Sequence, residues 1–74
     1  MAYPHSMKLN DITYVLKFHH TDGSDEFCYY DGREYAQEDF DLFDHSDSDI
    51  YTYIAFFEHD WRTNTTHMIE LKAL

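Results

Sequence analysis

The densest group of reactive side chains is an acidic run near the middle of the chain. Residues 34–49 hold seven carboxylates and no Lys or Arg, with aromatic and aliphatic residues between them. Carboxylates can bind a hard cation, exchange protons in catalysis or attract a basic protein surface. Asp47-Ser48-Asp49 lacks the Gly and the final Glu of a calcium loop. We therefore interpret the run as a surface for a basic partner, not as a metal site.

Other residues with chemical potential form no recognised catalytic pattern. His19-His20 has no third ligand at a metal-binding spacing, and Cys28 is the single cysteine, so no intrachain disulfide can form. No nucleophile elbow, phosphate-binding glycine loop or zinc-protease motif occurs. We expect no enzymatic activity, catalytic residue, cofactor or metal, and we expect Cys28 to pack as a small apolar residue.

A short helix must position the acidic run. Residues 38–44 can form about two helical turns, and at 100° per residue Ala36, Phe40 and Phe43 share one face. Acids crowd the carboxyl end of this helix with no cation to offset them, which opposes the helix dipole. Acids that lower the stability of a helix without compensation favour a binding role for that segment. The alternative is a solvated polar face followed by a loop. The acids concerned are Asp44, Asp47 and Asp49.

Alternating apolar residues predict the strands. Residues 12–19 alternate cleanly, Asp22-Gly23 is a strong hairpin signal, and residues 25–30 form the return strand. Residues 50–59 carry apolar side chains on both faces, which predicts a central strand or a face that meets a partner. Residues 66–73 form a weaker last strand. In that strand we expect Ile69 and Leu71 inward and Glu70 and Lys72 outward.

This β-β-α-β-β order predicts a small α+β fold. We expect an antiparallel sheet of three to four strands with one short helix packed on one face. We expect residues 1–74 to form one domain. Residues 1–6 match no structural pattern, and residues 1–8 are interpreted as a disordered tail or as a remnant of protein expression. A chain of this length builds only a small core and has no disulfide or metal staple, so a homodimer is expected.

The charge distribution limits the possible partners. The net charge is −10, and residues 22–49 account for all of it with eleven acids and one base, Arg33. Direct binding of nucleic acid or of an anionic membrane is excluded on electrostatic grounds. The complement of such a segment is a basic protein surface. No apolar run could span a bilayer, no signal peptide is visible and one cysteine is present, so a cytoplasmic location is expected.

The segment from Asp11 to Asp44 resembles the small dimeric uracil-DNA glycosylase inhibitors of Bacillus podoviruses. The shared features are a strand, the Asp22-Gly23 turn, an aromatic return strand, Gly32, and a short helix with Asp39-Phe40-Asp41-Leu42. The resemblance implies a dimer that mimics DNA and sequesters the apolar wedge with which the enzyme fills the gap left by the flipped base.

Two residues receive roles from this resemblance, and two features depart from it. Phe40 would line the apolar pocket between protomers, and Asp41 would contact the enzyme. Asp44 stands where the family has a Tyr, so Phe43 is the candidate substitute for that contact. This chain also continues past the third strand of the family through Trp61.

The predicted function is inhibition of a host uracil-DNA glycosylase by an acidic DNA mimic encoded by a phage. One alternative is a mimic aimed at another nucleic-acid enzyme, such as a restriction or CRISPR nuclease. The other is a small structural or regulatory domain whose acidic run is only solvated. The predicted partner-binding residues are Glu38, Asp39, Phe40, Asp41, Phe43, Asp44, Asp47 and Asp49.

Overall fold

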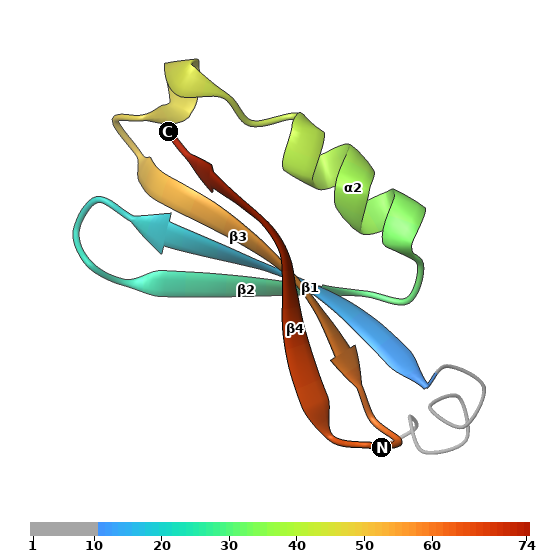
Figure 1. Ribbon diagram of the computed structural model, residues 1–74. Coiled ribbons are helices and arrows are strands. Elements are labelled where there is room, and N and C mark those ends of the chain that lie inside the picture. The colour runs from blue at the N-terminus through green and yellow to red at the C-terminus, as the bar shows by residue number, and fades with distance from the viewer. Residues whose placement is uncertain (1–10) are drawn as a thin grey trace.

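The computed structural model describes residues 11–74, which form one antiparallel sheet and one α-helix (Figure 1). This confirms the predicted α+β class. The spatial order of the strands is β2-β1-β3-β4. The predicted tail at residues 1–8 lies outside the described residues. The elements in chain order are β1 (Ile12–His20), β2 (Asp25–Tyr30), α2 (Arg33–Asp41), the 3₁₀ turn η1 (His45–Asp47), β3 (Tyr51–Asp60) and β4 (Thr65–Ala73).

The first hairpin forms where the sequence indicates. Gly23 has φ +94°, a backbone conformation that glycine adopts without a Cβ clash. The Asp22 carboxylate accepts hydrogen bonds from the amide and hydroxyl of Ser24, which holds the turn closed. Leu16 then pairs with Cys28, and Tyr14 pairs with Tyr30, so apolar and aromatic side chains of β1 and β2 pack against the core. Cys28 packs against the core as expected.

Helix α2 lies across one face of the sheet and closes the core (Figure 1). It spans Arg33–Asp41, so it extends further toward the N-terminus and ends earlier than the two turns predicted at residues 38–44. Ala36 and Phe40 are its buried residues, in agreement with the predicted apolar face. Phe43 follows the helix and packs edge-on against Phe18, with ring centroids 5.1 Å apart. The buried core residues are Leu16, Phe18, Ala36, Phe40, Ile54 and Phe56.

The prediction for the faces of β4 was wrong at Leu71 and Lys72. The β3–β4 register shifts between Phe56 and Phe57, where a bulge adds one residue to β4. Lys72 consequently pairs with Ile54 and lies on the helix side, while Leu71 pairs with Ala55 and points to the opposite side, where it is exposed. Ile69 does contact the core, as predicted.

The two faces of the sheet therefore have different environments. One packs under α2, and the other has no layer over it within residues 11–74. Among these residues, no helix is long and apolar enough to cross a membrane.

Candidate protein-binding surface

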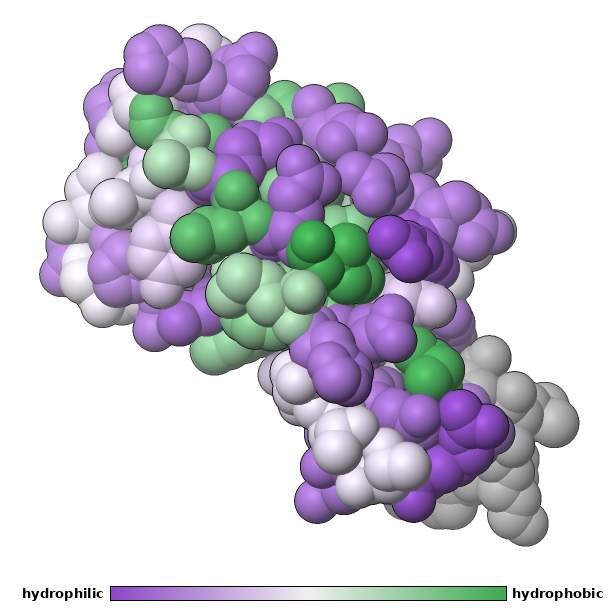
Figure 2. All heavy atoms as spheres, in the orientation of Figure 1, coloured by the Kyte–Doolittle hydropathy of each residue, from purple (hydrophilic) through white to green (hydrophobic). Residues whose placement is uncertain are grey.

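The side of α2 that faces away from the sheet combines acids with large apolar side chains. Tyr35 is 61 % exposed and Leu42 is 70 % exposed, and helical spacing places both beside Glu38. Glu34 and Asp41 are also exposed and complete this face. We call these five residues the helix surface. Hydrophilic residues cover much of the helix side of the molecule in Figure 2.

The carboxylates of the helix surface have no cationic partner in the described part of the chain. The ion pairs there involve Asp11, Asp25, Glu26 and Asp60. Asp41 receives one neutral hydrogen bond, 3.0 Å from the Gln37 amide nitrogen. Their negative charges are therefore available to an external cationic group.

The carboxyl end of α2 is stabilised by a cation that the local sequence does not reveal. The Lys72 Nζ donates hydrogen bonds to the carbonyl oxygens of Phe40 at 2.6 Å and Phe43 at 2.7 Å. It also lies 4.3 Å from the centroid of the Phe40 ring. This cation compensates the unpaired carbonyls and the negative end of the helix dipole. The expectation of an uncompensated helix end was therefore wrong.

Replacing Lys72 with methionine is expected to lower the free energy of unfolding by about 2–3 kcal/mol, because two part-buried carbonyls lose a charged donor. Urea unfolding followed by circular dichroism measures the change. Arg33→Met removes an exposed cation at the other end of α2 and serves as the control, with little change expected. Equal losses in the two variants would contradict the capping role of Lys72.

Asp44 and Asp47 stabilise the turn that follows the helix. The Asp44 carboxylate accepts from the amide and hydroxyl of Ser46, and the Asp47 carboxylate accepts from the Asp44 amide at 3.0 Å. This reciprocal arrangement is a capping box for η1. Both acids, predicted to bind a partner, thus have a structural role. Asp49 is exposed and remains available.

The capping role of Asp44 predicts a contribution to the free energy of unfolding that is lost at low pH. The hydrogen bonds from the Ser46 hydroxyl and amide lower the pKa of Asp44 below its ordinary value of 3.8. The carboxylate therefore stabilises the fold above pH 3.8, and this contribution is lost as the pH falls through the lowered pKa. In urea unfolding, the stability difference between the parent and Asp44→Ala should shrink below about pH 4. A difference independent of pH would exclude a role for the charged carboxylate.

Three other predicted site residues point toward the protein interior. Phe40 is 1 % exposed and packs against Phe56, so within this chain it is a core residue. Phe43 is half-buried against the core. Asp39 accepts a 2.7 Å hydrogen bond from the Tyr30 hydroxyl. Burial, and then this hydrogen bond, raise the pKa of Tyr30, which fixes the phenol as a donor to Asp39.

The structure brings Glu38 and Asp41 together with Tyr35 and Leu42, two residues that are not among the predicted partner-binding residues. The signal was present in the sequence, because the face opposite Ala36 and Phe40 also contains these two apolar residues.

The paired histidines of the first hairpin lie next to acids. His19 Nδ1 is 2.7 Å from an Asp25 carboxylate oxygen, and His20 Nε2 is 3.0 Å from Glu26. Within residues 11–74, no group of three or more His, Cys, Asp or Glu side chains could hold a metal ion.

No family model, curated protein or solved structure matches this chain. The likeness to the glycosylase inhibitors therefore depends on the short segment and the features named above.

Proposed function

We propose that this protein is an acidic DNA mimic that inhibits a uracil-DNA glycosylase by occupying its DNA-binding groove. The observation that supports this proposal is the helix surface. It presents carboxylates without cationic partners in the described chain, and exposed Tyr35 and Leu42 lie between them. A DNA-binding groove offers the complementary features, which are cations placed for phosphates and an apolar side chain that enters the base stack.

The spacing of the acids suits an extended basic groove. Glu34, Glu38 and Asp41 follow one another at about one helical turn, or roughly 5 Å along the axis. They form a row of negative charge on a helix whose opposite face is fixed in the core by Ala36 and Phe40. A rigid row of this kind requires little ordering when it binds, which reduces the entropic cost of association.

The apolar contact is assigned to exposed residues in place of Phe40. Tyr35 and Leu42 flank Glu38 on the helix surface and can meet the wedge side chain of the enzyme without unfolding the inhibitor. Tyrosine is frequent among the residues that dominate binding energy at interfaces. We therefore expect Tyr35 to contribute more to binding than any single acid.

A nuclease is the second candidate target. Phe40, on which the resemblance placed the enzyme-specific pocket, is buried in the core of this chain. The charge of the helix surface supports binding to a restriction or CRISPR nuclease equally well, because such enzymes also have basic DNA-binding grooves. Either kind of target would be met inside the host cell, so we propose that the protein acts in the cytoplasm.

Titration of the protein against a bacterial uracil-DNA glycosylase tests the proposal. Excision from a uracil-containing oligonucleotide should stop at a stoichiometric ratio. The association rate should fall steeply with added salt, because the attraction is electrostatic. Unchanged excision at about tenfold excess would reject this target. Repeating the titration with purified nucleases would then test the second candidate.

A further inference from the structure

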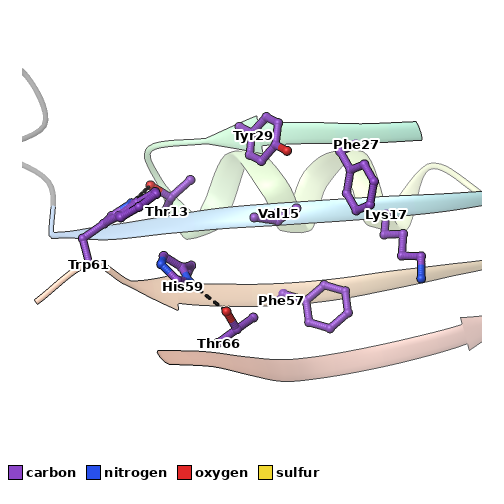
Figure 3. Close-up of a pocket in the computed structure, with 9 residues that line it drawn as sticks. All are labelled: Thr13, Val15, Lys17, Phe27, Tyr29, Phe57, His59, Trp61 and Thr66. Atoms are coloured by element: carbon purple, nitrogen blue, oxygen red, sulfur yellow. Dashed lines mark hydrogen bonds between the residues drawn. The ribbon is translucent and has the colours of Figure 1, made fainter. Parts of the chain in front are cut away.

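The sheet face opposite α2, which we call the open face, is hollowed and largely apolar. Figure 3 shows the side chains that line the hollow, drawn on the side of the sheet away from the helix. Its volume is about 430 Å³. The lining includes Val15, Phe27, Tyr29, Phe57 and Trp61. Strand pairing adds Met68 opposite Phe57 and Leu71 opposite Ala55 to the same face.

Most of these side chains are incompletely buried. Tyr29 is 68 % exposed, Trp61 is 51 % exposed, and Phe27, Met68 and Leu71 are exposed to a similar degree. Val15 of β1 and Phe57 of β3 lie between them, so they form one continuous surface and not scattered single residues. A contiguous apolar surface of this extent on a small protein indicates an interaction site.

The charge of the open face differs from that of the remainder of the molecule. Register places Lys17 between Phe27 and Ala55, and it places Asp25 beside His19 at the hairpin end. These are the Asp, Glu, Lys and Arg side chains that the described strands direct to this face, and their formal charges cancel. The net charge of −10 is therefore carried elsewhere.

This charge distribution selects among possible partners. A basic protein surface would find no row of carboxylates here, and a nucleic acid would find only the Lys17 cation on a chain that repels it. An apolar surface with almost no net charge is instead complementary to a second apolar, uncharged surface. The open face of a second copy meets this requirement and keeps the acidic segments of both chains apart.

We propose that the protein forms a symmetric dimer in which the open faces of two copies pack against each other. Four strands about 4.8 Å apart and up to ten residues long cover roughly 500 Å² of sheet, before the protruding side chains are counted. Two such faces reach the roughly 1,000 Å² that a specific interface requires. The resulting sandwich would bury the second apolar face of β3 and supply the core that a short chain lacks.

This arrangement is independent of the enzyme target. Because the sheets meet in the centre, the two α2 helices lie on opposite outer sides, and each helix surface stays accessible. A pocket shared between protomers would not form at Phe40. The dimer would present two separate acidic surfaces, and each could engage one enzyme molecule.

The test measures molar mass as a function of concentration by analytical ultracentrifugation. The parent should reach twice the chain mass. Tyr29→Glu should weaken dimerisation by about tenfold or more, since it places a charge in the apolar contact. Leu42→Glu makes the matched change on the outer side of α2 and should dimerise as the parent does. Circular dichroism must show that both variants are folded.

Salt dependence and Trp61 fluorescence provide further readouts. The dissociation constant of the dimer should fall as salt is added, because salt screens the repulsion between two chains of charge −10. Inhibition of an enzyme by the helix surface should instead weaken with added salt. Acrylamide quenching of Trp61, the single tryptophan, should fall as the dimer forms. A parent that keeps single-chain mass at every concentration, or a Tyr29→Glu variant that dimerises like the parent, would overturn the proposal. So would a Trp61 whose quenching does not change with concentration.

Discussion

Replacing Phe40 with alanine is expected to remove a large share of the stability of the protein. The ring is 1 % exposed, packs against Phe56 with centroids 5.5 Å apart, and lies under the Lys72 cation. Removing a buried Phe costs roughly 3–5 kcal/mol. A domain of this length has a total stability of only about 4–11 kcal/mol. Thermal and urea unfolding should therefore show a large loss of stability, and any loss of inhibition would follow from unfolding.

Tyr35→Ala is the matched control, because it truncates an exposed aromatic residue on the same helix. Its stability should stay within about 0.5 kcal/mol of the parent. If Tyr35 contacts the enzyme, inhibition should weaken by about thirtyfold, which corresponds to roughly 2 kcal/mol. A stable Phe40→Ala variant would contradict the assignment of Phe40 to the core. A Tyr35→Ala variant that inhibits like the parent would remove Tyr35 from the proposed contact.

Neutralising the three acids of the helix surface together is expected to reduce the association rate with the target enzyme by about 10–100-fold at low salt. The variant carries Glu34→Gln, Glu38→Gln and Asp41→Asn. Because none of these acids forms an ion pair within residues 11–74, the fold should be unaffected. The reduction should fade as salt is added, since salt screens the same attraction in the parent. Stopped-flow binding measures the association rates of the parent and the variant over a range of salt concentrations.

A second triple variant separates local charge from net charge. Asp11→Asn, Glu58→Gln and Glu70→Gln change the net charge by the same amount outside the acidic segment. Their effect on the association rate should be several-fold smaller. Equal effects would mean that total charge, not the helix surface, guides binding. Normal binding by the helix-surface variant would support the alternative of a solvated acidic face in a structural or regulatory domain.

Local patterns were sufficient for most of the secondary structure. The alternation in β1 and β2 and the Asp22-Gly23 turn specified the first hairpin, because both depend on neighbouring residues. The spacing of Ala36 and Phe40 identified the buried side of α2 for the same reason. The ends of β1, β3 and β4 differ by a single residue from the predicted ranges.

The cation at the acidic end of the helix could not be predicted, because it is distant in sequence. The Lys72 that caps α2 comes from β4, about 30 residues away, so no reading of the helix alone could include it. The acidic helix end then looked like a functional exception. Phe40, predicted to line a pocket between protomers, is buried against Phe56 within this chain.

The sequence by itself determined the α+β class, the first hairpin, the amphipathic helix and the concentration of negative charge in one segment. These properties follow from short-range periodicity and composition, which any stretch of chain carries with it. Only the tertiary structure decided that the bulge in β4, opposite Phe56 and Phe57, turns Leu71 outward and Lys72 toward the helix. Only the tertiary structure also showed an apolar sheet face with no layer over it in residues 11–74. Both depend on how strands far apart in sequence align, and this alignment is set by packing across the whole sheet.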